Sequence, residues 1–375
     1  MKRIDWNLFC FLILSLLSIC ACRKSEHRSN GTNIIEEAEL MAIYNRSGYD
    51  EVFIVNARGD EVAHYVLVDR DDTTHFDLPD GAVELRVPLQ NVIVDSEIYA
   101  SAFDELGASD VLSGIFDAQY VTSPSLASKV SRGTIKGLGP TSSPDAETIV
   151  KLNPDAILVS YFEGMQTQGL DKLGIPIVKM FDLQESSPLG RAEWLRFIGL
   201  LAGKEVSADS LFTLTRNKYA GLKRQGGEGN NAERPKVLTE LIYEGTWYVP
   251  GGKSYQAALI DDAGGNYFKK EDGRTASLNL TAEQVLVEGG DADVWLIRFY
   301  GDEEQLLAVL ESDPIYGRMK AYKDGNIYFS NTAESGLFRE FPFHPELLLQ
   351  DYRVIFSGDS TTTLRYFKRL ESTEK

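Results

Sequence analysis

Aromatic pairs follow two short apolar runs of this sequence, and an arginine directly precedes one of them. Tyr161 and Phe162 end the first run, and Arg298 lies just before Phe299 and Tyr300 at the end of the second. Aromatic faces can replace the hydration of a large ligand at low entropic cost, and a guanidinium supplies directed hydrogen-bond donors. The pattern favours binding of a bulky planar or caged molecule. The alternative for each ring is simple packing in the core.

Further candidate contacts occupy comparable positions along the chain. Trp247 and Tyr248 occur in a Gly-rich turn after another apolar run, and Ser96 and Tyr99 follow the first such run. Arg339 is a second candidate donor, although Phe338-Arg339-Glu340 equally suits a solvated, ion-paired turn. The predicted ligand contacts are therefore Tyr99, Tyr120, Tyr161, Phe162, Trp247, Tyr248, Arg298, Tyr300 and Arg339.

The N-terminus has the pattern of an export signal. Lys2 and Arg3 precede an almost wholly apolar run from Leu8 to Ile19. At about 1.5 Å per residue that run spans about 18 Å, too short for a bilayer core of roughly 30 Å. Ile19-Cys20-Ala21-Cys22 resembles the bacterial lipobox, which implies cleavage after residue 21 and acylation of Cys22. An ordinary secretory signal is the alternative.

Few side chains suited to catalysis remain in the mature chain. Cys10 and Cys20 leave with residues 1–21 and Cys22 carries the lipid, so no thiol is left for a disulfide, a metal or nucleophilic attack. The sequence has no Gly-x-Ser-x-Gly motif, and Trp247 occupies the first glycine position that a phosphate-binding loop ending at Ser254 would need. The four histidines are scattered at His27, His64, His75 and His344. We predict no enzyme, no cofactor and no metal site built by the protein.

The charge balance excludes nucleic acid as a partner. The chain has 38 Lys and Arg against 56 Asp and Glu, and loss of Lys2, Arg3 and Asp5 leaves 36 against 55, a net charge of −19. Such a surface repels polyanions and anionic lipid. Contact with a membrane is therefore expected through the lipid anchor only.

The pattern of apolar and polar residues changes near Val87. Residues 22–33 are polar and suit a flexible tether, and residues 34–90 show short alternating runs that predict antiparallel strands or hairpins. Beyond them, buried-strand runs alternate with helical stretches, which is typical of parallel sheets covered by helices. We predict an α/β fold with an extra β-rich N-terminal segment.

An internal repeat predicts two similar α/β lobes, at residues 91–189 and 226–375. Ala146-Glu147 and Ala282-Glu283 each begin a short helix that feeds a strand, with the same spacing to a following Asp-Ala pair. Ser143 is the expected N-cap of the first helix, and a capping box of Thr281 with Gln284 is expected at the second. Apolar residues at helical spacing predict one long, stiff linking helix over 190–225.

In their order along the chain, these features resemble the iron-siderophore and cobalamin binding proteins of ABC importers, whose two lobes are joined by one rigid helix. The resemblance covers roughly Val87 to Phe356. Its marks are Gly137-Leu-Gly, Glu147-Thr-Ile-Val-Lys-Leu-Asn-Pro-Asp, Pro188-Leu-Gly-Arg-Ala-Glu-Trp, Tyr248-Val-Pro-Gly-Gly-Lys-Ser and His344-Pro-Glu-Leu-Leu-Leu-Gln-Asp.

The resemblance implies a monomeric periplasmic protein that holds a metal chelate (an iron-siderophore, cobalamin or heme) between its lobes. It also implies partners, an ABC permease and its ATPase, with Glu147 and Glu283 docking onto permease arginines. The alternative for both glutamates is a first-turn acid that the helix dipole stabilises. Two other functions stay open: a surface or periplasmic lipoprotein that binds carbohydrate or protein, and an exported hydrolase. The stretch after Cys22 lacks an acidic cluster, which favours the periplasm over surface export.

Overall fold

The computed structural model describes residues 31–227 and 234–371. The predicted signal peptide, Cys22 and most of the predicted tether lie outside the described residues. Every element below lies in one compact unit, Asn33–Lys375. Within the described residues, no helix combines the length and the apolar character that crossing a membrane requires.

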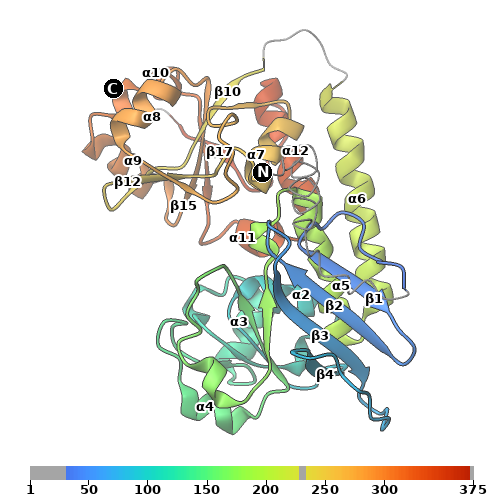
Figure 1. Ribbon diagram of the computed structural model, residues 1–375. Helices are drawn as coiled ribbons and strands as arrows, with labels where there is room; N and C mark the ends of the chain where they lie inside the picture. Colours follow the sequence, from blue (N-terminus) through green and yellow to red (C-terminus); the bar gives the residue numbers. More distant parts are fainter. Residues whose placement is uncertain (1–30, 228–233, 372–375) are drawn as a thin grey trace, which may run out of the picture. The chain divides into compact units, whose positions relative to one another are not determined.

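The N-terminal segment forms a four-stranded sheet, drawn in blue in Figure 1. Its strands, in spatial order, are β1 (Met41–Asn45), β2 (Tyr49–Val55), β3 (Glu61–Asp69) and β4 (Val83–Val87). The first two pairings are antiparallel, as predicted, but β4 runs parallel to β3 because residues 70–82 cross back over the sheet end. Ile43, Val52 and Ile54 share one core with the lobe that follows. The extra sheet is thus packed on the first lobe.

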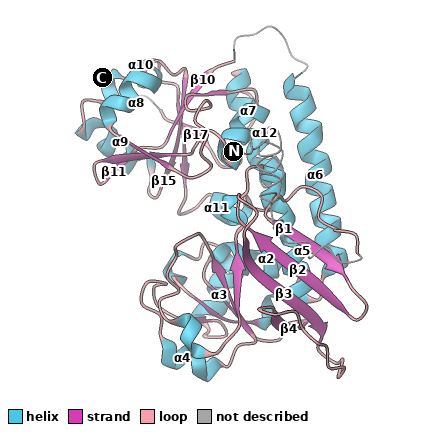
Figure 2. Cartoon of the chain, in the orientation of Figure 1, coloured by secondary structure: helices cyan, strands magenta, loops and turns pink. Residues whose placement is uncertain are grey.

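The first lobe is built on a parallel five-stranded sheet with helices packed against it (Figure 2). The strand order is β7 (Lys136–Gly137), β6 (Leu112–Ile115), β5 (Val92–Val94), β8 (Ala156–Ser160) and β9 (Ile177–Met180). The helices are α2 (Glu97–Glu105), α3 (Pro124–Ser131) and α4 (Ala146–Leu152). Residues 156–159 of β8 are all buried, because a parallel sheet is covered on both faces.

The second lobe repeats this plan. Its main sheet has the order β13 (Asn266–Tyr267), β10 (Lys236–Thr239), β15 (Val294–Phe299), β16 (Ile327–Asn331) and β17 (Lys368–Arg369), of which only β17 is antiparallel. A small antiparallel sheet holds β11 (Ile242–Tyr243), β12 (Thr246–Val249) and β14 (Leu278–Leu280). The helices are α7 (Tyr255–Asp262), α8 (Ala282–Gly289), α9 (Glu303–Ser312), α10 (Lys320–Lys323), α11 (Leu337–Glu340) and α12 (Pro345–Ser357). The predicted fold class is confirmed.

The internal repeat has the expected structure. α4 leads into β8, which lies beside β5, and α8 leads into β15, which lies beside β10. The capping box of Thr281 with Gln284 is present. The predicted cap at Ser143 is wrong: Asp145 caps α4 and accepts the Thr148 N–H at 3.0 Å. A carboxylate makes the stronger cap because its charge also interacts with the helix dipole.

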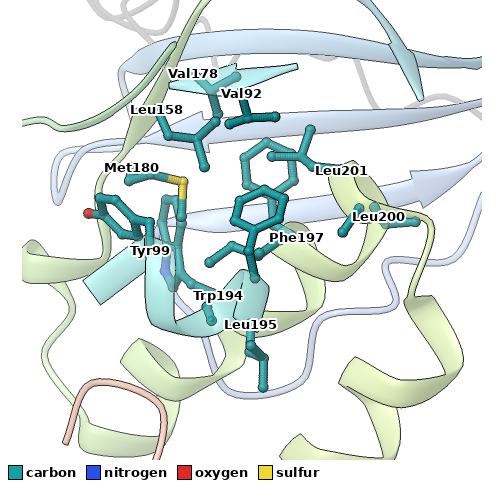
Figure 3. Packing of buried hydrophobic residues seen from close by; sticks show 14 of the residues in the cluster. Val92, Tyr99, Leu158, Val178, Met180, Trp194, Leu195, Phe197, Leu200 and Leu201 are labelled. Atoms are coloured by element: carbon teal, nitrogen blue, oxygen red, sulfur yellow. The ribbon is translucent and has the colours of Figure 1, made fainter. Parts of the chain in front are cut away.

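The predicted single linking helix over 190–225 is also wrong, because the segment forms two helices, α5 (Pro188–Ala202) and α6 (Glu205–Gly227). Gly203 ends α5 in the left-handed region, with φ of 63°, and a Cβ there would lie 2.9 Å from Pro88 Cβ. Trp194 and Phe197 of α5 pack into the core of the first lobe (Figure 3), whereas α6 packs along α5 and α12.

Two buried carboxylates of this region hold the start of the folded chain. Glu193, which is 0% exposed, accepts hydrogen bonds from the backbone N–H groups of Glu36, Glu37 and Ala38. Glu185 accepts from the N–H of Leu40 and from Trp194 Nε1. Burial raises the pKa of Glu185, and these hydrogen bonds oppose the shift. Residues 36–40 are therefore fixed to α5 and its neighbouring loop.

Candidate binding cleft

Exposed apolar side chains lie just beyond the carboxyl ends of parallel strands in both lobes. Tyr120 and Leu183 follow β6 and β9 of the first lobe, and Tyr300 and Phe338 follow β15 and β16 of the second. Their exposed fractions are 57, 39, 64 and 48%. Ligands of α/β folds bind beyond this edge of the sheet, and grouped exposed apolar side chains mark binding surfaces. These loops are the candidate site.

Two of the predicted ligand contacts meet across the lobes. The rings of Tyr120 and Tyr300 lie 5.9 Å apart, edge to face, at an interplanar angle of 88°. Both rings keep more than half of their surface exposed. A ligand that enters between these loops exchanges this ring–ring contact for two ring–ligand contacts. Binding by either tyrosine stays a prediction.

A cavity of about 350 Å³ lies between the same two sets of loops. Ile98 and Leu183 of the first lobe line it, together with Arg298, Phe338 and Phe341 of the second. Its volume is at the lower end of the range of small-molecule sites. A bulky ligand would therefore also occupy the open space beside Tyr120 and Tyr300.

Arg298, a predicted donor, lines this cavity as half of an ion pair. Its Nε lies 2.7 Å from Glu240 Oε1, and Nη2 contacts the same oxygen. The two side chains are only 16 and 17% exposed. Burial acts to lower the pKa of Arg298, but the charge and hydrogen bond of Glu240, together with Tyr352 and Tyr255, hold the pKa above its ordinary value. The guanidinium is thus fixed and already has a carboxylate partner.

Arg191, a second cavity arginine, was not predicted. Its Nε donates to Asp182 Oδ2 at 2.9 Å, and its Nη1 donates to Tyr255 Oη of α7 at 2.8 Å. Asp182 is 0% exposed and also accepts from Tyr99 Oη at 2.8 Å. The predicted ligand contact at Tyr99 is therefore wrong: the ring is fully buried (Figure 3), and its hydroxyl belongs to this internal network.

The network continues to the end of β5 in the first lobe. Ser160 Oγ lies 3.1 Å from Tyr99 Oη and also contacts Asp95. Burial raises the pKa of Asp95 to about 7, against the opposing hydrogen bonds from Ser160. A chain of polar groups therefore joins the carboxyl edge of the first sheet to α7 of the second lobe.

Arg339 bridges the lobes beside a second cavity of about 360 Å³. Its Nη1 donates to Thr122 Oγ1 at 3.1 Å, and Nη2 lies 2.9 Å from Glu340 Oε1. The ion pair agrees with the interpretation of Phe338-Arg339-Glu340 as an ion-paired turn, and ligand binding by Arg339 stays a prediction. His344, at the start of α12, lies in the same cavity, with Nε2 2.8 Å from Glu105 Oε1 of α2.

The bond between His344 and Glu105 predicts a pH-dependent stability. Burial acts to lower the pKa of His344, but Glu105 and Glu346 together raise it to about 9. Because the folded-state pKa is the higher one, the stabilisation is complete below the unfolded pKa of about 6.5 and is lost as pH rises through about 9. We expect His344→Gln to remove about 2 kcal/mol of this pH-dependent stability between about pH 6 and pH 10. Denaturant unfolding of both proteins at the two pH values measures it; parallel profiles would contradict the assignment.

Trp247 and Tyr161 line neither of the two cavities described above. Trp247 is 0% exposed, stacks 5.7 Å from Trp295 and donates through Nε1 to Thr239 O, so its predicted ligand contact is wrong. Tyr161 is half-buried beneath Lys179, whose Nζ lies 4.6 Å from the ring centroid, and it packs on the core of the first lobe. For both residues the packing alternative accounts for the ring.

Phe162 and Tyr248 are 53 and 43% exposed, but neither lines the two cavities above. The residue after Phe162, Glu163, accepts from Asn56 Nδ2, so this loop faces the turn between β2 and β3. Tyr248 lies between the buried residues Trp247 and Val249 on β12 and thus points to the opposite face of the small sheet. Their predicted roles have no support from the described geometry.

Glu147 and Glu283 occupy equivalent exposed positions in the first turns of α4 and α8. The Glu147 side chain is 78% exposed and pairs with Lys151, one helical turn on. An exposed ion pair of this kind contributes little to folding stability and leaves the carboxylate accessible. The geometry agrees with both interpretations, so docking stays a prediction.

Comparison with known proteins found a family model and several relatives that match this chain. A family model described as periplasmic binding protein matches residues 92–332, from β5 to just beyond β16. An uncharacterised lipoprotein of Methanocaldococcus jannaschii is 24% identical over 365 residues, covering 87% of this chain and 86% of its own. A cobalamin-binding protein of Halobacterium salinarum is 25% identical over 262 residues, covering 69% of this chain and 68% of its own.

A solved structure shares the two-lobed architecture. The triscatecholate siderophore binding protein of Bacillus subtilis, complexed with ferri-bacillibactin, superposes with a TM-score of 0.58 over 77% of this chain and 100% of its own. The sequence identity is 17%, so the likeness concerns the fold. The four-stranded N-terminal sheet lies before the residues that the family model matches.

Proposed function

Because this chain belongs to the periplasmic binding protein family, we propose that it binds a metal chelate between its lobes and delivers it to an ABC importer. The observation that carries the proposal is the meeting of exposed Tyr120 and Tyr300 from facing strand-end loops, next to a cavity that both lobes line. A rigid ring system surrounded by apolar edges needs such faces to replace its hydration. Heme is such a ring system, and cobalamin and ferric catecholates likewise present broad ring faces to a binding site.

The names of related proteins support the chelate class. One relative is named for cobalamin, and a protein of the same fold was solved with a ferric siderophore. In the proposed delivery step, Glu147 and Glu283 each meet a cationic patch of the permease. Two separated carboxylates fix the orientation of the complex as well as its attraction, since such pairs govern encounter rate and register.

A lipid on Cys22 would hold the protein at the membrane near its importer. The name of the M. jannaschii relative supports this anchor. We expect Cys22→Ala to move the protein from the membrane fraction to the soluble fraction, because two or three acyl chains hold stably and none would remain. Membrane fractionation with metabolic palmitate labelling measures both effects. Continued membrane association of the unlabelled variant would rule out the lipid anchor.

Tryptophan fluorescence titration of the protein lacking residues 1–22 tests the proposed function. Trp194, Trp247 and Trp295 are each 0% exposed, so quenching is expected through energy transfer to a coloured chelate rather than through contact. The panel comprises cyanocobalamin, hemin and ferric siderophores, with correction for their own absorbance. Saturable quenching by one of them supports the proposal; absence of saturable binding across the panel would reject it and favour a carbohydrate- or protein-binding lipoprotein.

A further inference from the structure

We infer that this cleft selects a chelate without net negative charge and that Glu240 is the residue that sets this preference. The inference rests on the proposed function and narrows its ligand class. Without a ligand, the positive charges in the cleft are already neutralised, because each arginine that lines the cavity pairs with a carboxylate.

Arg298 and Arg191 are both paired with a carboxylate. Arg298 places Nε and Nη2 on Glu240, and Arg191 places Nε on the fully buried Asp182. The second bond of Arg191 goes to the hydroxyl of Tyr255. An anionic ligand that recruited either guanidinium would leave a carboxylate without its counter-charge in a largely buried site, which is strongly unfavourable.

Arg339, which lies beside the cleft, is likewise paired, with Glu340, and the loops that directly follow the strands offer no replacement cation. The segments that follow the strands are 116–123 after β6, 161–169 after β8, 181–187 after β9, 240–245 after β10, 300–302 after β15 and 332–336 after β16. None of them contains Lys or Arg, whereas Asp117, Glu163, Glu244, Asp302 and Glu334 are among their acidic residues. The field at the mouth of the cleft therefore repels anions, as does the net charge of the whole chain.

The backbone holds Glu240 in place against Arg298. Glu240 has φ of 65°, a left-handed conformation that side-chain-bearing residues rarely adopt. Its N–H donates to Leu296 O at 3.0 Å, and its carbonyl accepts from Trp295 Nε1 at 2.8 Å. Two bonds to β15 thus keep the carboxylate on the guanidinium of the same strand, so the pair does not open easily to admit an anion.

The test compares affinities for chelates graded by charge. Cyanocobalamin has no net charge, hemin carries two carboxylates, and a ferric triscatecholate carries several negative charges. For the wild-type protein, we expect the Kd for cyanocobalamin to be at least about tenfold below that for the triscatecholate, a difference of about 1.4 kcal/mol. We expect Glu240→Gln, which keeps the side-chain length but frees the charge of Arg298, to shrink this ratio about tenfold.

Two further variants test whether the effect of Glu240→Gln comes from the lost charge or from altered folding. Glu311→Gln removes one charge from the exposed C-terminal end of α9 and should leave the ratio unchanged. The double variant Glu240→Gln with Arg298→Gln removes both charges and should restore the wild-type ratio. Tighter wild-type binding of the triscatecholate, or an unchanged ratio in Glu240→Gln, would overturn this inference and leave the proposed function standing. Failure of every chelate to bind would reject the proposed function together with it.

Discussion

Replacing Glu147 and Glu283 together by arginine is expected to abolish delivery of the chelate to the importer while its affinity stays unchanged. The two residues lie in the first turns of α4 and α8, outside the cavities between the lobes. Arginines at both positions would face the permease arginines, and juxtaposed like charges cost several kcal/mol, so uptake should fall by about a hundredfold or more. Uptake into proteoliposomes that contain the permease and ATPase measures this, with ligand titration in parallel.

The controls for this prediction come from the same chain. Glu311→Arg makes the same charge change as either single replacement, at an exposed helix end, and should leave uptake close to wild type. Each single glutamate variant should show an intermediate defect, and the defect should depend on salt, since exposed charges are screened. Loss of chelate affinity in the double variant would instead place these residues in ligand binding and contradict the docking role.

Removing both rings of the aromatic pair should have the largest effect on binding. We expect Tyr120→Ala with Tyr300→Ala to weaken chelate binding about thirtyfold, or ~2 kcal/mol, because each ring contributes apolar area and a stacking face. Both rings are more than half exposed, so folding should be little affected. Isothermal titration calorimetry with the chelate that binds best measures the loss.

Phenylalanine at both positions is the matched control. Tyr120→Phe with Tyr300→Phe keeps the faces and removes the hydroxyls, so affinity should stay within a few-fold of wild type. An equally large loss in the phenylalanine variant would shift the role from stacking to hydrogen bonding. Unchanged affinity in the alanine variant would mean that the chelate binds away from this pair.

The fold was predictable because its signals are local. The helix–strand repeat at Ala146 and Ala282 is readable from spacing, and it correctly predicts two lobes. The break at Gly203 was missed because apolar residues continue at helical spacing on both sides of it. A single glycine inside such a pattern is tolerated in many helices, and here the left-handed turn and the close approach of Pro88 distinguish it.

The site was less predictable because its contacts are distant in sequence. Tyr99 and Tyr120 both follow strands, but the first is buried in the core, as part of α2, and the second is 57% exposed beside Tyr300. Glu240 lies 58 residues from Arg298, and His344 lies 239 residues from Glu105. No local pattern identifies such partners. The one sequence signal for Glu240 is that it directly follows a strand, as the predicted ligand contacts do.

Hydrogen–deuterium exchange with and without the chelate tests most directly whether this cleft is the binding site. We expect slower exchange on binding in two distant segments, the loop after β6 around Tyr120 and the loop after β15 around Tyr300, because one ligand would contact both lobes. Protection confined to one lobe, or to the four-stranded N-terminal sheet, would contradict it.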